Sequence, residues 1–330
     1  MNGVTGSPTF FGDYITLYGS LDLNHQMNWR LYQTHLRSPR TGSILRTTGT
    51  PFMYLTYGDS CWYTLQDSLY AEWIYHQNGN VDYNGQNINT RLLSGYPSAQ
   101  AITANSTFFL KDMYFDGTFI GSATTDIEFD KGPAYCSNNR ASTFRSMHFS
   151  VRGYLSDSVS VNTILADESI DIGNANLFTD AEFHKDVNVS GSNSINNLLL
   201  ANGGYNFSQA PGETLTLGTS LQVQADCNGL AGIRSTIAGS PSSISMASGN
   251  VVVDFVSLNS IAAGGGATFT ANNSVDGGNN TGWTINSPAP RTVYWVGGSG
   301  NWSDPAHWSL SSGGSSGACV PAAIDQVVFD

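Results

Sequence analysis

Two short stretches hold carboxylates close to arginines, the combination that lyases and hydrolases acting on acidic polysaccharides require. The residues are Asp126, Glu128 and Asp130 in TDIEFD, Asp167, Glu168 and Asp171 in ADESID, and the arginines Arg145 and Arg152. In such an enzyme a carboxylate takes or gives the proton, and the cation neutralises the uronate. Carboxylates that alternate with apolar residues, however, share one face of a strand, commonly the solvated one. We therefore favour a structural role for both stretches, and no residue is predicted to be catalytic.

Two histidines in strand-like segments are the other candidates for acid–base chemistry: His148 in MHF and His184 in EFHKDV. A catalytic histidine works with a paired acid and a nucleophile, and the sequence places neither pair beside them. Both are predicted to be surface or packing residues.

The stretch SVDGGNNTGW offers oxygen ligands on a tight glycine-rich loop, as calcium requires. The candidate ligands are Asp276, Asn279 and Asn280. Only one of the three is a carboxylate, and loops of glycine and asparagine also form turns without an ion. Calcium is thus the one cofactor that the sequence suggests, and an ion-free turn is the alternative.

Aromatic residues gather in the first quarter of the chain, where they would suit a glycan or a protein partner. The candidates are Trp29, Tyr32, Trp62, Trp73 and Tyr75. A sugar platform needs exposed rings, whereas burial in the core is the usual alternative. Four arginines between positions 30 and 46 also make this the most basic stretch, which indicates a local contact surface on an otherwise acidic chain.

The composition indicates strands and turns. Charged residues make up 12% of the chain, Asp outnumbers Glu by 20 to 5, and there are 36 glycines. Asp and Asn favour turns, whereas the scarce Glu and Lys favour helices. A net charge of −12 argues against nucleic acid as a partner, and no apolar run approaches the roughly 18 residues that span a membrane.

Strand-like runs with alternating apolar and polar residues recur along the chain, separated by turn residues. They cover residues 14–23, 80–88, 107–120, 125–130, 169–178, 213–223 and 250–258. A similar phrase returns at intervals of roughly 15 to 30 residues, as expected for the coils of a solenoid. We predict an all-β fold, a right-handed parallel β-helix (β-solenoid), in preference to a pair of β-sandwiches. Stacked coils should then form asparagine ladders and aliphatic or aromatic stacks.

The composition shifts at NSPAPRT, residues 286–292. We predict a β-solenoid module over 1–286, a linker over 287–292, and the opening segment of a following β module over 293–330. The last coil of the solenoid should be GGGATFTANNSVDGGNNTGW, with Trp283 covering the final layer of core. The closing QVVFD reads as a strand without a following turn, so the sequence is interpreted as a piece of a longer polypeptide.

Four cysteines lie far apart, at positions 61, 136, 227 and 319, and no CxxC pair suggests zinc. An oxidising compartment would permit disulfides, but their pairing is not determined by the sequence. Buried or free thiols are the equal alternative.

Several phrases resemble the repeat modules of very large secreted cell-surface, adhesin-like proteins of Bacteroidota-type bacteria. They are ITLYGSLDL, CWYTLQDSL with NGNVDYNGQNI, GETLTLGTSLQVQADCNGLAGIRS, and GNVVVDFVSLNSIAAGGGATFTANNSVDGGNNTGW. The tail VYWVGGSGNWSDPAHWS resembles the start of the next such module. The resemblance implies a β-helical protein at the cell surface, exported by the type IX route in many relatives. It also implies O-glycans on Asp-Ser/Thr-apolar triplets, which makes Ser68 and Ser158 candidates.

These patterns favour a structural stalk or fibre module of an extracellular surface protein, acting in adhesion or matrix assembly. Stacked coils end in exposed strand edges, which pair with whatever is near. The expected partners are therefore copies of the chain or neighbouring modules, end to end, with surface glycans as further partners. The alternative is a carbohydrate-active β-helix, either a glycan-binding module or a polysaccharide lyase or hydrolase.

Overall fold

The computed structural model describes residues 9–23, 28–58, 61–137, 143–156 and 158–329. Strands make up 56% of the structure, and parallel sheets stack into a β-solenoid of about 13 turns, as predicted. Two compact units divide the chain, Met1–Ile195 and Asn196–Asp330, and each is described by itself.

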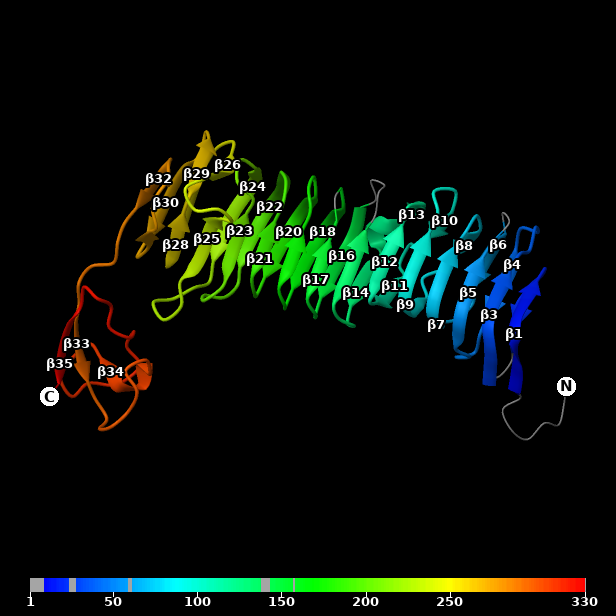
Figure 1. Cartoon of the computed structure of the whole chain (residues 1–330), viewed down its shortest axis with the longest axis horizontal. Helices are drawn as coiled ribbons and strands as arrows, with labels where there is room; N and C mark the ends of the chain where they lie inside the picture. The colour runs from blue at the N-terminus through cyan, green and yellow to red at the C-terminus, as the bar shows by residue number, and fades with distance from the viewer. Residues whose placement is uncertain (1–8, 24–27, 59–60, 138–142, 157, 330) are drawn as a thin grey trace. The chain divides into compact units, whose positions relative to one another are not determined.

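Unit 1 has a main sheet of parallel strands that follow one another in chain order (Figure 1). Its strands are β1 (Thr9–Leu17), β3 (Asn28–Leu36), β5 (Phe52–Tyr57), β7 (Leu69–His76), β9 (Asn87–Gly95), β11 (Thr107–Leu110), β12 (Asp112–Phe115), β14 (Asp126–Phe129), β15 (Ala134–Ser137), β16 (Thr143–Phe149), β17 (Gly153–Leu155), β18 (Ser160–Ala166), β19 (Ile170–Ile172), β20 (Leu177–Phe183) and β21 (Val187–Val189). Because the strands are parallel and in register, each coil adds one residue to every column of side chains along the sheet.

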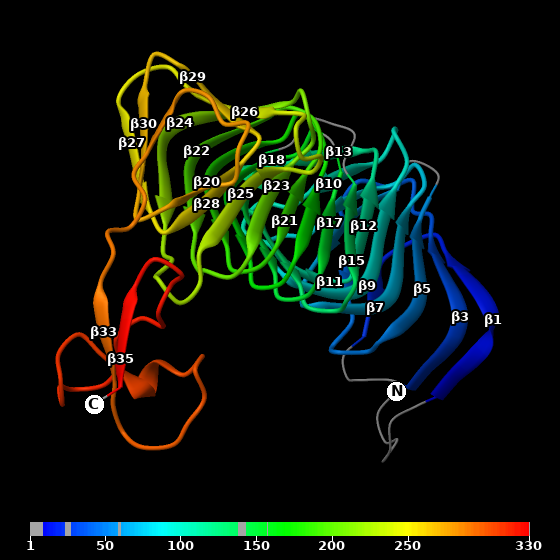
Figure 2. The same cartoon turned by 60° about the vertical axis from the view of Figure 1, so that its left-hand side comes forward.

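A second sheet forms another wall of the first coils. Figure 2 shows β10 and β13 of this sheet on a different side of the coil from β5, β7 and β9. Its strands are β2 (Leu21–Asp22), β4 (Ser43–Arg46), β6 (Trp62–Leu65), β8 (Asn80–Asp82), β10 (Gln100–Ile102) and β13 (Thr118–Ile120), and the 3₁₀ turn η1 (Ser122–Thr124) follows.

The coil changes shape after β9. That strand pairs with β11 along its first half and with β12 along its second half, because the chain turns at Lys111. The run 107–120, which the sequence indicated as one strand, is therefore the three strands β11, β12 and β13. Gly95 ends β9 where the Phe115 ring packs, since a Cβ there would lie 2.4 Å from that ring.

Aromatic side chains stack inside the coils. The buried rings of Phe129 and Phe149, on successive coils, lie 4.3 Å apart at 11°. Nearer the N-terminus, His76 Nε2 and Tyr83 Oη lie 2.8 Å apart in the core. Burial lowers the pKa of His76 to about 3, so this ring is neutral and acts as a packing residue.

An asparagine ladder closes the turns of neighbouring coils. Val159 N donates to Asn176 Oδ1, and Asn176 N donates to Asn193 Oδ1, each over 2.8 Å and 17 residues of sequence. Asn176 Nδ2 also donates to Gly173 O at 3.0 Å. Both asparagines are buried, so the ladder satisfies backbone groups that water does not reach. This confirms the ladder that the sequence led us to expect.

Unit 2 continues with short parallel strands, and β22 (Asn193–Leu200) spans the boundary between the units. Its strands are β23 (Asn206–Gln209), β24 (Thr214–Val223), β25 (Ala231–Ser235), β26 (Ser242–Met246), β27 (Asn250–Asp254), β28 (Val256–Asn259), β29 (Ile261–Gly265), β30 (Thr268–Asn272), β31 (Val275–Asp276) and β32 (Trp283–Ile285). Strand β32 is the last in the order β27-β30-β32, and Trp283 on it meets the buried Phe269 edge to face at 5.0 Å. Whether this coil closes a module stays a prediction.

A small separate sheet follows, in the order β34-β33-β35. It consists of β33 (Thr292–Trp295), the 3₁₀ turn η2 (Pro305–His307), β34 (Trp308–Ser309) and β35 (Gln326–Phe329). Asp304 caps η2 by accepting a hydrogen bond from Ala306 N at 2.9 Å. Trp308 is fully buried, and the ring of Trp302 lies 4.7 Å from it. Whether this sheet opens a further module stays a prediction.

Candidate functional site

A stack of aromatic rings lies on the outward face of the first coils of unit 1. Tyr54 is in register with Trp73, and their rings lie 4.2 Å apart at 23°. Tyr75 is nearly parallel to Tyr54, at 6.1 Å and 11°, and the ring of Tyr32 leans against Tyr54 at 4.7 Å. We call Tyr32, Tyr54, Trp73 and Tyr75 the aromatic face.

A hydrogen bond joins two of these rings. A hydrogen bond of 3.3 Å links Tyr32 Oη and Tyr54 Oη, and this bond, ahead of burial, raises the pKa of Tyr54 to about 12. The Tyr54 phenol is therefore neutral at any physiological pH.

The structure brings together three of the five predicted aromatic residues. Tyr32, Trp73 and Tyr75 share one face, whereas Trp62 lies on β6 in the second sheet. Trp29 is on β3, but its side chain is outside the described part of the structure. The sequence prediction missed Tyr54, which lies at the centre of the stack. Tyr54 could be identified only from its register with Trp73, and predicting that register requires knowing the number of residues in each coil.

A chain of alternating carboxylates and imidazoles crosses later coils of unit 1. His148 Nδ1 lies 2.9 Å from Glu128 Oε2, and its Nε2 lies 2.8 Å from Asp167 Oδ2. His184 Nδ1 lies 3.1 Å from Asp167 Oδ1, and its Nε2 lies 2.7 Å from Glu182 Oε1. We call these five residues the acid–imidazole chain.

The geometry indicates that the His148 imidazole is protonated. Both ring nitrogens of His148 face carboxylate oxygens, and only an imidazolium donates from both nitrogens. Partial burial lowers the pKa of His148, but the hydrogen bonds and charges of Asp167 and Glu128 outweigh it and raise that pKa above 6.5. The acid–imidazole chain therefore links successive coils through hydrogen bonds between imidazole nitrogens and carboxylate oxygens.

The sequence predicts only a surface or packing role for the two histidines. The structure shows them holding Glu128 and Asp167, one carboxylate from each predicted acidic stretch, and it adds Glu182. The available signal was a spacing close to one coil, since His148 and its two carboxylates are 20 and 19 residues apart in sequence.

The remaining carboxylates of the two stretches have other neighbours. Asp126 accepts from both Arg145 and Ser146, and the Arg145 hydrogen bond lowers the pKa of Asp126. Asp171 lies 3.1 Å from Arg152 Nη2 and accepts from Asn188 Nδ2 at 2.8 Å.

The last two candidates lie at the surface. Asp130 lies 3.4 Å from Lys131 Nζ, and Glu168 is exposed. The carboxylates of the two acidic stretches thus have three kinds of surroundings: ion pairs with arginines, the acid–imidazole chain, and the exposed surface.

The predicted calcium ligands bond within their own turn and to the preceding coil. Asp276 Oδ1 accepts from Gly278 N at 2.9 Å and from Asn280 Nδ2 at 2.6 Å. Asn280 Oδ1 accepts from Ile261 N at 3.0 Å, and Asn279 takes the left-handed backbone conformation, with φ 57°. The described residues contain no group of three or more His, Cys, Asp or Glu arranged to hold a metal ion. The calcium hypothesis stays a prediction.

The two glycosylation candidates differ in exposure. Ser68 is half-buried, and the preceding Asp67 carboxylate accepts from Thr47 N at 2.9 Å. Ser158 is exposed with φ 63°, while the Asp157 of its triplet is outside the described residues. Both sites stay predictions.

A disulfide joins Cys227 to Cys319 in unit 2, while Cys61 and Cys136 are buried thiols outside any disulfide. Burial raises the pKa of the Cys136 thiol, so it stays protonated. The disulfide pairs a loop after β24 with the segment before β35, and Val320 N donates to Asn228 Oδ1 at 3.3 Å beside it.

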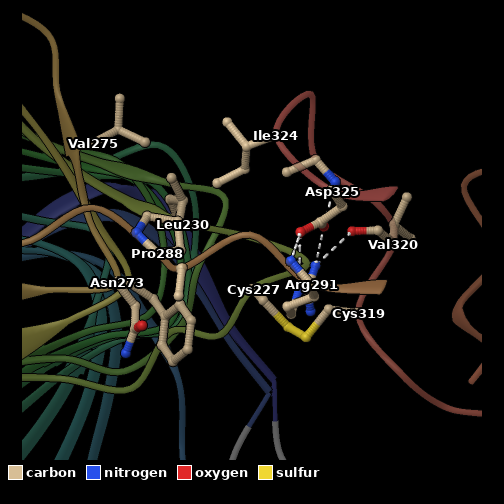
Figure 3. Close-up of a pocket in the computed structure, with 13 residues that line it drawn as sticks. Cys227, Leu230, Asn273, Val275, Pro288, Arg291, Cys319, Val320, Ile324 and Asp325 are labelled. Atoms are coloured by element: carbon tan, nitrogen blue, oxygen red, sulfur yellow. Dashed lines mark hydrogen bonds and ion pairs between the residues drawn. A yellow bond between two sulfur atoms is a disulfide. The ribbon is translucent and has the colours of Figure 1, made fainter. Parts of the chain in front are cut away.

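Next to the disulfide lies a mainly apolar cavity of about 360 Å³ (Figure 3). Leu230, Pro288 and Ile324 contribute to its walls. Arg291 and Asp325 form an ion pair at its edge, with Nη2 and Oδ2 2.6 Å apart. The Arg291 hydrogen bond lowers the pKa of the buried Asp325 to about 2, so the pair is charged at physiological pH. The cavity volume is within the range of small-molecule sites.

No known protein family, curated protein or solved structure matches the chain. The resemblance to surface-protein modules therefore stays a hypothesis. The part of the chain that the structure describes has no helix with the length and apolar character needed to cross a membrane.

Proposed function

We propose that the chain is a structural β-solenoid module of an extracellular surface protein, in adhesion or matrix assembly, which associates end to end with copies of itself or with neighbouring modules. The observation that carries this proposal is the edge of the main sheet in unit 1. Among the described residues, β1 pairs with β3 alone. The outer side of a strand that pairs on one side only offers a row of amide and carbonyl groups to a further strand.

The side chains around this edge also favour association. Phe11, Tyr14 and Tyr18 are 75%, 70% and 69% exposed. Large exposed aromatic groups at an open edge are a common mark of an interface. In unit 2, β31 and β32 each pair on one side within the described residues, which supplies edges of the complementary kind.

The disulfide supports the proposed location. Disulfides persist in oxidising compartments such as the cell exterior, and they are rare in the cytosol. The Cys227–Cys319 bond therefore favours an extracellular site.

The test removes one outward amide of β1. Arg37 N donates to Leu17 O, so the backbone of Leu17 faces β3 and that of the neighbouring Thr16 faces outward. Thr16→Pro deletes the outward N–H and should weaken self-association by roughly tenfold, about 1.4 kcal/mol, in sedimentation velocity over a wide concentration range. Thr16→Val keeps the N–H and is the matched control. A chain that stays monomeric throughout, or equal association of the two variants, would contradict the proposal.

A carbohydrate-active enzyme is the competing proposal. Reducing-sugar and lyase assays on acidic polysaccharides separate the two, since turnover that depends on Glu128 or Asp167 would contradict a purely structural role.

A further inference from the structure

The outward side of β3, β5 and β7 is unusually rich in exposed apolar groups. Tyr32 is 55% exposed, Met53 is 43% exposed and Tyr70 is 46% exposed. The solvated face of a strand usually carries short polar side chains, and a contiguous apolar patch marks a place of interaction.

The rings of the aromatic face form one surface across three coils. Tyr54 and Trp73 occupy the same column, and Thr56 and Tyr75 occupy a column two residues along. The planes of Trp73 and Tyr75 lie within 23° and 11° of the plane of Tyr54. Successive strands are about 4.8 Å apart, so the surface offers an aromatic contact at every coil along a line across the strands.

The groups around the rings are mostly neutral. Strands β3, β5 and β7 carry only two outward residues of fixed charge, Arg30 and Glu72, and these have opposite signs. Gln33 is in register with Tyr54, Asn89 with Tyr70, and Ser94 with Tyr75. The amide of Gln33 and the hydroxyl of Ser94 therefore border the aromatic face, while Leu92 is in register with Trp73 and follows the exposed Arg91 on β9.

This chemistry selects one kind of occupant. Aromatic rings pack against C–H groups, while phenol, amide and hydroxyl groups exchange hydrogen bonds with neutral hydroxyls. A ligand that presents both, without charge and in an extended form, is an uncharged polysaccharide. We propose that the aromatic face of unit 1 binds an uncharged polysaccharide chain lying across β3, β5 and β7. A protein partner is the competing occupant.

Affinity electrophoresis in gels that contain hydroxyethyl cellulose, laminarin or dextran tests this proposal, with alginate as the charged comparison. The native chain should be slowed by at least one neutral polysaccharide and less by alginate. Trp73→Ala and Tyr54→Ala should each weaken that binding by about tenfold, and Trp73→Phe should retain most of it.

The matched control is a stacked pair outside the patch. Tyr135 and Tyr154 lie further along the same sheet, with rings 4.6 Å apart at 7°. Tyr135→Ala should therefore leave binding unchanged. Hydrogen exchange on each variant confirms that the coils are folded, so a loss of binding is assigned to the ring itself.

Four results would overturn the proposal: no slowing by any neutral polysaccharide, equal slowing by alginate, Trp73→Ala that binds like the native chain, or an equal loss in Tyr135→Ala. The first would favour a protein partner for this face. Running the series in the Thr16→Pro background keeps glycan binding separate from self-association, so one proposal can fail without the other.

Discussion

Two outward surfaces of unit 1 share the same stacked backbone but are held by different forces. The aromatic face over β3–β7 is joined by ring contacts, whereas the acid–imidazole chain over β14–β20 is joined by hydrogen bonds between imidazoles and carboxylates. A solenoid fixes where the side chains of successive coils meet, and the residue types decide what joins them. Stability of the two regions should therefore respond to different perturbations.

The largest effect should come from the core that underlies both surfaces. Phe149→Ala removes a fully buried ring that stacks on Phe129 beneath the acid–imidazole chain. The loss should be about 3–5 kcal/mol of stability, because burial is lost and a cavity remains. Urea unfolding measures the loss, and Phe149→Leu is the control that should retain most of the stability. A loss of stability no larger than that of Trp73→Ala or Arg145→Gln would contradict this prediction.

Trp73→Ala should cost about 2 kcal/mol by removing a half-buried ring that stacks on Tyr54. Since no titrating group is lost, the effect should be equal at about pH 5.5 and about pH 8.5. Hydrogen exchange should place the loss in β5, β7 and β9, and Trp73→Phe should recover much of it. A strong dependence on pH would remove the distinction between the two surfaces.

His148→Gln should produce a loss that does depend on pH. The groups facing His148 are Glu128 and Asp167, and His184 and Glu182 complete the chain. Because the folded-state pKa of His148 is raised above 6.5, its stabilisation is fully present below pH 6.5 and is lost as pH rises through the raised value. Urea unfolding should show a loss of about 1 kcal/mol at about pH 5.5 and little at about pH 8.5.

The control for this pH profile is Trp73→Ala, which keeps the whole acid–imidazole chain. A profile for His148→Gln that runs parallel to that of the native protein would show that His148 is a packing residue alone.

The smallest effect should be that of Arg145→Gln, which removes the ion pair with Asp126. Half of the Arg145 side chain is exposed, so the loss should be about 0.5 kcal/mol at low salt. It should shrink as salt screens the charges, whereas the loss in Trp73→Ala should not. Unfolding curves at low and high sodium chloride check this, and a loss that is independent of salt would point to packing of the Arg145 stem.

The sequence was sufficient to predict the solenoid because its physical signals are local. Alternation identified the strands, and Gly and Asn identified the turns. Buried Asn176 and Asn193 form the kind of ladder that the composition indicated. The corners of the coil were harder to predict, since the turn at Lys111 carries neither glycine nor proline.

The candidate sites were predicted only in part, because they depend on register between coils. Residues in register are 17 residues apart at Asn176 and Asn193 but 20 apart at Glu128 and His148. Without the length of each coil, the sequence does not show that Tyr54 meets Trp73. Nor does it show the pairing of Cys227 with Cys319, 92 residues away.

That disulfide also determines how the chain would carry a mechanical load. A pull applied on either side of the bridge passes from Cys227 to Cys319 through the sulfur–sulfur bond and bypasses the residues between them. Strands β25 to β34 are therefore relieved of tension while the bond is intact. Reduction would release a hidden contour length of roughly 300 Å. In a single-molecule stretching experiment, the molecule should therefore lengthen abruptly by this amount only after a thiol reagent is added.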